Sequence, residues 1–236
     1  ADTFIRGADL SFLPEIESAG VILYNNAKAE GMLTTLKNAG CNTIRIRLWK
    51  NPVGGHSGID EVKTLAQKAK SAGMKVWLTV HYSDTWADPA VQTTPAEWKN
   101  LSFADLKTAV AAYTSTILTE INPDIIQIGN EINSGLLWPQ GHLINKETQC
   151  LAILTTASAT IRSKAPNAKI MIHYAGVSAS DTNWFYCANW ENLRVPDEKT
   201  DVFISGATAN ADIKSNAAYA ELYNKNDFSV NINANL

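Results

Sequence analysis

The sequence has little of several features that mark particular protein classes. Its three cysteines (Cys41, Cys150 and Cys187) are too few for a disulfide framework, and their odd number leaves at least one free. The net charge is −3, which gives no basic field for nucleic acid. No stretch approaches the roughly 20 apolar residues that a membrane helix needs. We therefore expect no nucleic-acid partner and no transmembrane segment.

Three catalytic or cofactor motifs are also missing. The four histidines and the cysteines show no close His-x-x-His or Cys-x-x-Cys spacing, so we expect no metal site and no resident cofactor. No Gly-x-Ser-x-Gly elbow occurs, which leaves a serine hydrolase without an anchor. Residues 7–12 read Gly-Ala-Asp-Leu-Ser-Phe and lack the Gly-x-Gly-x-x-Gly pattern of a dinucleotide-binding sheet.

The composition is that of an ordinary globular protein. Of the 236 residues, 45% are hydrophobic and 18% are charged, and α/β barrels of this length commonly form one domain. We expect a single domain over residues 1–236 that acts as a monomer. The sequence starts at Ala1-Asp2 without a charged-then-apolar leader, which fits a secreted, cell-surface or periplasmic protein after removal of its signal peptide, and equally a trimmed chain.

Short β-rich runs alternate with helical patterns along the chain. The helical patterns are apolar residues from Ile59 to Ala69, ending at Gly73, and from Leu106 to Ile121, after a capping box formed by Ser102 and Asp105. The expected strands are Thr3–Arg6, Thr43–Trp49, Lys75–Val80, Asp124–Ile128 and Lys169–His173, with weaker candidates at Asp201–Ser205 and Phe228–Ile232. This alternation predicts an α/β fold with a parallel sheet covered by helices. Polar and aromatic residues gather just after several strands, which favours a (β/α)8 TIM-type barrel, with its last strands uncertain or incomplete.

The segment Gln127–Asn133 is the most informative part of the sequence. It places Asn130 and Glu131 just past a buried strand, behind Gly129. Glutamate is among the residues least often buried without a partner, so this position suits chemistry better than packing. A polar turn at a strand end is the alternative, and it would be preferred if the dipeptide stood alone.

Strand Thr43–Trp49 alternates strictly between two kinds of side chain. Arg45, Arg47 and Trp49 share one face and the aliphatic residues share the other, which suits packing on helices. Two guanidinium groups are therefore expected inside the barrel, with carboxylate partners nearby. A structural ion pair is an equal alternative for Arg45 and a weaker one for Arg47, which lies nearer the end of the strand.

The loop His81–Pro89 follows the next strand and carries His81, Tyr82, Asp84 and Trp86. This mixture suits sugar hydroxyls and the apolar faces of pyranose rings. A hydrogen-bonded structural histidine is the alternative for His81, and a turn is preferred for Asp88-Pro89. Trp49, Trp86 and Trp138 all follow strands, so a carbohydrate platform and core packing are about equally expected for them.

These segments carry a family resemblance. Thr43–Trp49, His81–Pro89 and Gly129–Pro139 closely resemble glycoside hydrolase family 53, and Arg6–Ser11 and Lys169–His173 also look like that family, so that the resemblance spans residues 4–195. Members of this family are endo-β-1,4-galactanases, (β/α)8 barrels that cleave the arabinogalactan side chains of pectin with retention. The resemblance implies a polysaccharide substrate and this activity.

The resemblance also implies roles for individual residues. Glu131 would be the general acid/base, and Asn130 would bind the hydroxyl next to the reacting carbon. The other substrate-binding residues would be Arg45, Arg47, His81, Asp84 and His173, with Trp86 and Trp138 facing sugar rings. The family has an occasional calcium site in late loops, so calcium is a possible ligand by resemblance, without residues assigned to it. Another retaining glycosidase of the same barrel clan, such as a mannanase or xylanase, would share the Asn-Glu pair but would not explain the His81–Pro89 loop.

The second carboxylate that a retaining glycosidase needs is not identifiable. The family places it in a Glu-Thr-x-Tyr-Pro type motif after strand seven, and neither this motif nor the Ser-Tyr-Tyr-Pro signature after strand six occurs. The glutamates after the fifth expected strand are Glu191, Glu198 and Glu221. Three interpretations stay open: a sequence incomplete or wrongly assigned near its C-terminus, a chain truncated before strand eight, or a diverged barrel that binds galactan without cleaving it.

Overall fold

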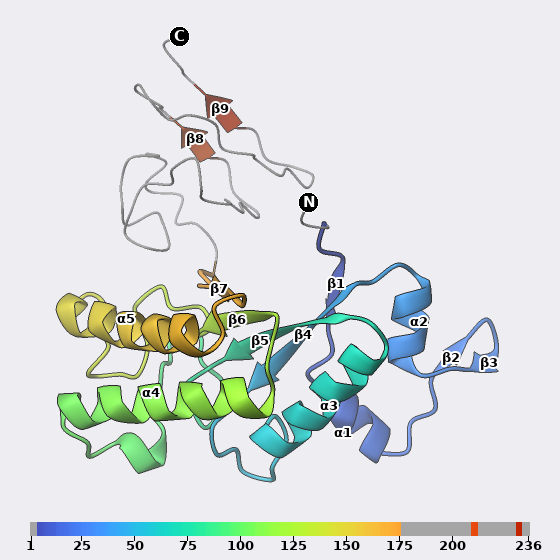
Figure 1. Ribbon diagram of the computed structural model, residues 1–236, viewed down its shortest axis with the longest axis horizontal. Helices are drawn as coiled ribbons and strands as arrows, with labels where there is room; N and C mark the ends of the chain where they lie inside the picture. Colours follow the sequence, from blue (N-terminus) through green and yellow to red (C-terminus); the bar gives the residue numbers. More distant parts are fainter. Residues whose placement is uncertain (1–3, 176–208, 212–229, 233–236) are drawn as a thin grey trace. The chain divides into compact units, whose positions relative to one another are not determined.

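The computed structural model describes residues 4–175, 209–211 and 230–232 (Figure 1). The chain divides into two compact units, the first ending at His173 and the second beginning at Tyr174. In the second unit, β8 (Ala209–Ala211) pairs in parallel with β9 (Val230–Ile232). The expectation of a single domain over residues 1–236 stays a prediction.

The first unit is built on a five-stranded sheet in which all neighbouring strands run parallel. In spatial order the strands are β1 (Gly7–Asp9), β4 (Thr43–Leu48), β5 (Lys75–Val80), β6 (Ile125–Ile128) and β7 (Lys169–Met171). Three long helices connect the last four of these strands: α3 (Ile59–Ser71), α4 (Phe103–Glu120) and α5 (Glu147–Lys164). Helices α4 and α5 lie side by side along the sheet (Figure 1). The predicted alternation of parallel strands and helices is confirmed.

Shorter elements complete the first unit. They are helices α1 (Leu13–Ser18) and α2 (Met32–Asn38), the antiparallel pair β2 (Tyr24–Asn25) and β3 (Lys28–Ala29), and the 3₁₀ helix η1 (Ala96–Trp98). In the described part of the chain, no helix is long and apolar enough to cross a membrane.

The expected first strand is displaced in the structure. It was predicted at Thr3–Arg6, whereas β1 spans Gly7–Asp9, so that prediction is wrong. The amide of Arg6 instead donates to the side-chain oxygen of Asn42, at 3.0 Å. Gly7 lies so close to β4 that a Cβ there would be 3.1 Å from the carbonyl oxygen of Thr43. The glycine therefore belongs to the strand because it permits this close approach.

Two weaker strand candidates were predicted near the C-terminus, Asp201–Ser205 and Phe228–Ile232. Asp201–Ser205 lies outside the described residues. Within Phe228–Ile232, the structure describes Val230–Ile232 as β9.

The two predicted helices form where expected. Val62, Leu65, Ala66 and Ala69 form the buried stripe of α3, and Gly73 follows the helix with φ +72°. At the start of α4, the Ser102 hydroxyl accepts from the amide of Asp105 at 3.2 Å and donates to its carboxylate at 2.7 Å. Both helices thus begin or end at the residues that the capping signals indicate.

The two faces of the sheet differ in character. One face is aliphatic and joins the hydrophobic core; it includes Ile44, Ile46, Leu48, Val76, Leu78, Val80, Ile126 and Ile128. The alternate positions on β4, β5 and β6 carry Arg45, Arg47, Trp77, Thr79 and Gln127. The predicted split of β4 into an arginine face and an aliphatic face is therefore confirmed, and the polar face leads toward the strand ends.

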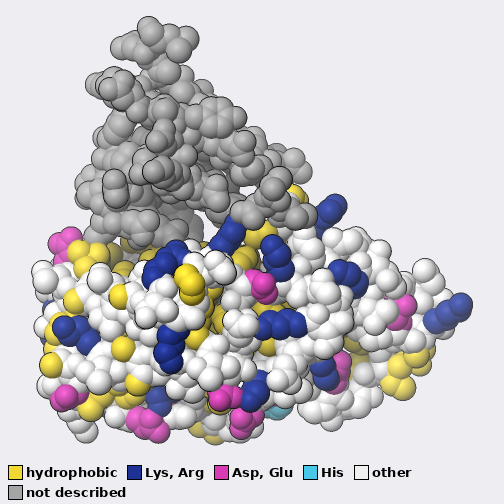
Figure 2. Space-filling view, viewed as in Figure 1, with side chains coloured by type: hydrophobic (Ala, Val, Ile, Leu, Met, Phe, Trp, Pro, Cys, Tyr) yellow, Lys and Arg dark blue, Asp and Glu magenta, His cyan; other side chains and the backbone are white. Residues whose placement is uncertain are grey.

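On the molecular face shown in Figure 2, acidic and basic side chains of the described residues are interspersed with hydrophobic ones. No patch of a single sign stands out among them on this face.

Candidate functional site

The candidate site lies where the strands of the sheet end. Four predicted residues lie within a few positions of the carboxyl end of a strand: Trp49 after β4, His81 after β5, Asn130 after β6 and His173 after β7. Parallel strands bring these ends to one edge, which is where (β/α) barrels form their active sites.

Asn130 connects several segments of this edge. Its side chain is 7% exposed, and its Oδ1 accepts from Nη2 of Arg45 at 3.0 Å and from Nε2 of Gln127 at 3.3 Å. The same oxygen lies 3.2 Å from Nδ1 of His173. Its Nδ2 donates to the carbonyl oxygen of Ala87 at 2.8 Å. The amide is therefore fixed in orientation, and its second N–H, which no described residue accepts, is the group that can reach a ligand.

Arg45 has the carboxylate partner that the sequence predicts. Its Nη1 lies 2.6 Å from Oδ2 of Asp9, and Oδ1 of Asp9 accepts from the amide and hydroxyl of Ser11 at 2.9 and 2.6 Å. Burial raises the pKa of Asp9, but the bonds from Ser11 and the nearby Arg45 outweigh it and leave this pKa below its usual value. The sequence did not reveal Asp9 as the partner, because the strand that carries it was expected earlier in the chain.

Arg47 is satisfied in a different way. It is 3% exposed, and its Nε and Nη2 donate to the hydroxyl of Ser57 at 3.0 and 2.8 Å. Its guanidinium carbon lies over the rings of Trp49 and Trp86, at 4.2 Å from each centroid, and over Phe12 at 4.5 Å. Burial lowers its pKa, although the group remains cationic at neutral pH. The negative charges of Asp9, Glu15 and Glu61 oppose this shift, so carboxylates do lie near Arg47 as expected. None of the described carboxylates forms an ion pair with it, and the rings surround its guanidinium instead.

Trp86 combines exposure with a fixed position. Its side chain is 50% exposed, yet its ring packs edge-on against Trp49 at 5.4 Å and against His81 at 6.0 Å. An exposed ring held by other rings loses little freedom when a sugar stacks on it, which suits the predicted platform.

His81 is a neutral hydrogen-bond donor in this arrangement. It is 2% exposed, and burial is the largest of the causes that lower its pKa to about 3, with the charges of Arg45 and Arg47 contributing. Its Nδ1 accepts from the amide of Ala87 at 3.0 Å. We assign the proton to Nε2 from these bonds, and no described residue accepts from that nitrogen.

Asp84 and Trp138 are both tied to the loops around the site. Oδ1 of Asp84 accepts from the amide of Asn51 at 3.1 Å, and its Oδ2 accepts from the amide of Ala96 at 2.8 Å. The indole N–H of Trp138 donates to the carbonyl of Ser134 at 3.0 Å, and its ring stacks on His142 at 4.8 Å. Asp84 thus joins two loops. A direct contact of either residue with substrate stays a prediction.

Glu131 has an unusual backbone conformation. It is half-buried with φ +52°, a region that costs a residue with a Cβ on the order of 1–3 kcal/mol. It follows Gly129, which has φ +78° and where a Cβ would lie 2.5 Å from Cγ2 of Ile132. Among the described residues, none donates a hydrogen bond to its carboxylate. The turn therefore holds a carboxylate at the strand edge under backbone strain.

Sequence reasoning missed several residues that support the site. Gln127 is fully buried, and its Oε1 accepts from Trp77 and Thr79, both at 3.2 Å. A glutamine among isoleucines at an inward-facing strand position is a signal that could have identified it. Ser57 and Gln92 lie on loops, and no local pattern marks them.

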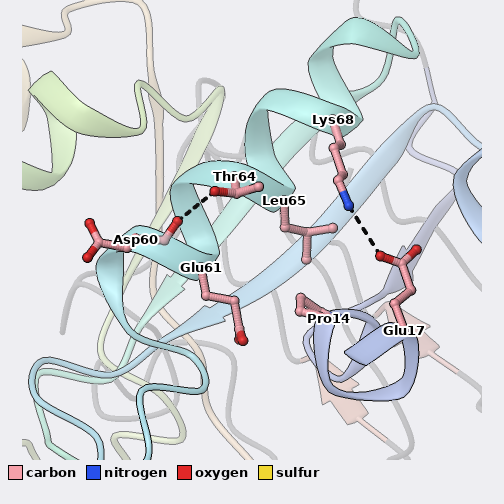
Figure 3. Close-up of a pocket in the computed structure, with 7 residues that line it drawn as sticks. All are labelled: Pro14, Glu17, Asp60, Glu61, Thr64, Leu65 and Lys68. Atoms are coloured by element: carbon pink, nitrogen blue, oxygen red, sulfur yellow. Dashed lines mark hydrogen bonds and ion pairs between the residues drawn. The ribbon is translucent and has the colours of Figure 1, made fainter. Parts of the chain in front are cut away.

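A shallow pocket lies between α1 and α3 (Figure 3). Its lining includes Glu17, Asp60, Glu61 and Lys68, and Lys68 lies 3.2 Å from Glu17. None of the predicted site residues lines it. We regard it as a feature of the helix surface.

Metal binding has no support in the described ranges. Within residues 4–175, 209–211 and 230–232, no group of three or more histidine, cysteine or acidic residues could hold a metal ion. A calcium site in late loops, and the absence of any cofactor, both stay predictions.

The fold and the site together define a class of protein. A parallel α/β sheet with polar and aromatic side chains gathered at its carboxyl edge is the arrangement of (β/α)-barrel proteins. The model of glycosyl hydrolase family 53 matches residues 5–206. The chain therefore belongs to glycosyl hydrolase family 53, which confirms both the resemblance and the predicted fold class.

Individual relatives agree with this assignment. An arabinogalactan endo-β-1,4-galactanase of Thermothelomyces thermophilus is 40% identical over 189 residues, which cover 77% of this chain and 57% of that protein. A Niallia circulans protein described as uncharacterized, from the bgaB 5′ region, is 36% identical over 199 residues, covering 78% and 54%.

Two solved structures are also similar. The Ignisphaera aggregans GH53 catalytic domain has a TM-score of 0.73 and 34% identity, covering 89% of this chain and 59% of that one. A structure from a study of two fungal β-1,4-galactanases has a TM-score of 0.72 and 35% identity, covering 89% and 64%. The chain spans just over half the length of these curated relatives.

Proposed function

We propose that this protein hydrolyses β-1,4-galactosidic bonds within galactan, acting inside the polymer and with retention, and that Glu131 is the general acid/base. The observation that carries the proposal is the Asn130–Glu131 turn at the end of β6, in a chain of family 53. The names of the relatives support galactan as the substrate. The arabinogalactan side chains of pectin, met outside the cell, are the natural form of this polymer that we propose.

Glu131 acts in both halves of the proposed reaction. As an acid, its carboxyl protonates the oxygen of the leaving sugar while a second carboxylate attacks the anomeric carbon. As a base, the resulting carboxylate then takes a proton from the water that hydrolyses the glycosyl-enzyme. Retention requires the two carboxyl groups to lie about 5–5.5 Å apart. The glutamates available for the second role, Glu191, Glu198 and Glu221, lie outside the described residues.

The residues around Glu131 bind the sugar. Asn130 offers its free Nδ2–H to the hydroxyl next to the reacting carbon, while Arg45 and His173 hold its Oδ1 in place. His81 offers Nε2–H to another hydroxyl. The exposed ring of Trp86 stacks on a pyranose face, and Trp138 provides a second such surface.

A second candidate is a non-catalytic galactan-binding protein that uses the same residues. The observation in its favour is that the 236 residues contain no Glu-Thr-x-Tyr-Pro type motif to supply the second carboxylate, although they cover only 57% of the length of one galactanase relative. The two candidates differ in turnover and agree in binding.

Release of reducing sugar from linear β-1,4-galactan distinguishes them, when run beside the intact mass and a galacto-oligosaccharide titration of the same sample. We expect sugar release. Binding without release would instead support the binding protein, provided that the sample spans the full length of its galactanase relatives, of which these 236 residues cover 57% in one case. If the protein neither bound galactan nor released sugar from it, both candidates would be contradicted.

A further inference from the structure

Gln92 is a buried glutamine beside the proposed acid/base. It lies in the loop between β5 and α4 and is 2% exposed. Its Nε2 donates to the carbonyl oxygens of Asn130 at 2.8 Å, Glu131 at 3.2 Å and Asp88 at 3.0 Å. A single side chain thus holds the carbonyls of both residues of the Asn-Glu pair.

The chemistry of these contacts fixes the orientation of the amide. All the partners of Nε2 are carbonyl oxygens, which can only accept, so a flipped amide would place oxygen against oxygen. The other end of the group, Oε1, is buried and accepts no hydrogen bond from the described residues.

The loop around Gln92 holds the rest of the turn as well. The backbone carbonyl of Gln92 accepts from the amide of Trp138 at 2.8 Å, and the hydroxyl of Thr94 donates to the carbonyl of Trp138 at 2.7 Å. The segment 92–94 therefore contacts the loop after β6 at two places, at Asn130 and Glu131 near its start and at Trp138 farther along.

Glu131 needs such support because of its backbone conformation. With φ +52° it occupies a region that persists in a non-glycine residue only when the surroundings hold it there. Without the bonds from Gln92, the backbone of Glu131 could relax toward an ordinary conformation, which would redirect its carboxylate.

We propose that Gln92 is a positioning residue for Glu131: its amide fixes the two carbonyls and so sets the direction in which the carboxyl group points. This inference rests on the proposed function, because it gives the orientation of Glu131 a role in turnover. Misplacing a catalytic group by about 1 Å can lower a rate on the order of 100-fold. Gln92 itself is buried and is not proposed to touch the substrate.

The first test compares Gln92→Leu with Gln140→Leu. Gln140 lies in the loop between β6 and α5 and also donates to a backbone carbonyl, that of Leu101 at 2.9 Å, so it controls for the loss of one such side chain. We expect kcat on linear β-1,4-galactan to fall by about 10- to 100-fold in Gln92→Leu, with KM within about twofold, and Gln140→Leu to retain kcat. A folded Gln92→Leu with unchanged kcat, or an equal loss in both variants, would overturn the proposal.

The isosteric variant Gln92→Glu adds a readout that loss of packing would not give. A protonated glutamic acid keeps one donor for the carbonyls, whereas the carboxylate has none and repels them. Activity relative to wild type should therefore rise as the pH falls from about 7 to about 5, since burial raises the pKa of a carboxyl group. If the ratio of variant to wild-type activity were the same at both ends of this range, with the variant folded throughout, the result would contradict a donor role.

Amide hydrogen exchange tests the same claim without turnover. In Gln92→Leu, or in Gln92→Glu at neutral pH if the leucine variant does not fold, we expect exchange in residues 130–133 to accelerate at least tenfold, while Ile125–Ile128 of β6 keep their protection. Unchanged exchange in the turn would overturn the proposal. If the wild-type chain released no sugar, the proposed function would fail, and exchange would still decide whether Gln92 holds the turn.

Discussion

The two arginines on β4 lie on the same face of the strand, yet each lies in a different region of the site. Arg45 belongs to a polar region in which Asp9 pairs with it and Asn130 accepts from it. Arg47 belongs to an aromatic region formed by Phe12, Trp49 and Trp86. Arg45 thus pairs with a carboxylate, whereas Arg47 donates to the Ser57 hydroxyl and lies over three ring faces.

This difference suggests a division of labour. Polar groups held by several hydrogen bonds are preorganised for interactions that strengthen during reaction, whereas ring faces bind substrate and transition state about equally. We therefore expect changes in the polar region to act mainly on kcat and changes in the aromatic region to act mainly on affinity. The predictions below test that division.

Within this comparison of the two regions, the largest effect is expected for Asn130→Ala. The variant removes the N–H proposed to bind the hydroxyl next to the reacting carbon, and it leaves Arg45 and Gln127 without their shared acceptor. We expect kcat to fall by about 100- to 1000-fold, the loss typical of one preorganised donor, with a smaller change in KM. Steady-state kinetics on linear galactan measures this, with the exposed Asn100→Ala as control. A loss confined to KM would erase the distinction between the two regions.

The next effect is on the pH dependence of stability and involves His81. This residue contacts the rings of Trp49 and Trp86, and the positive charges of both arginines lower its pKa. Its pKa is lowered from its usual 6.5 to about 3 in the folded protein, so the unfolded chain binds a proton that the folded one excludes. The stability that neutral His81 contributes to the folded protein is fully present above about pH 6.5. It is lost as the pH falls toward 3, at up to about 1.4 kcal/mol of unfolding free energy per pH unit.

Denaturant unfolding between about pH 6.5 and about pH 4 measures this slope. The variant His81→Gln cannot take up the proton, so its free energy of unfolding should decline less steeply over that range, whatever its absolute stability. Parallel slopes in wild type and variant would show that His81 is not the group responsible.

The smallest effect is expected in the aromatic region. Trp86→Ala removes a half-exposed ring, and we expect the dissociation constant for galacto-oligosaccharides to rise by about 10-fold while kcat changes little. Isothermal titration checks this against Tyr24→Ala, which removes an exposed ring from β2. An unchanged dissociation constant would assign Trp86 to packing alone.

Local patterns in the sequence were enough to predict much of this fold. The inward arginines of β4, the apolar stripes of α3 and α4, and the capping at Ser102 and Gly73 depend on neighbours in sequence, and the structure contains all of them. The position of β1 was wrong because Gly7 reads as a loop residue until its close approach to Thr43 is known.

The site divides in the same way. Asn130 and Glu131 were visible because they directly follow a buried strand. Asp9, Ser57 and Gln92 were not, because their partners lie between 10 and 39 positions away in sequence and depend on how the loops cross the strand ends. The family resemblance supplied roles for the predicted residues, but it did not supply the contacts that hold those residues in place.

The most direct test of the central claim is the activity of Glu131→Gln on linear β-1,4-galactan, measured together with its affinity for galacto-oligosaccharides. The glutamine keeps the size of the side chain and removes the transferable proton. We expect hydrolysis to be abolished while the dissociation constant stays within about twofold of wild type. Retained hydrolysis in this variant would remove Glu131 from the role of general acid/base.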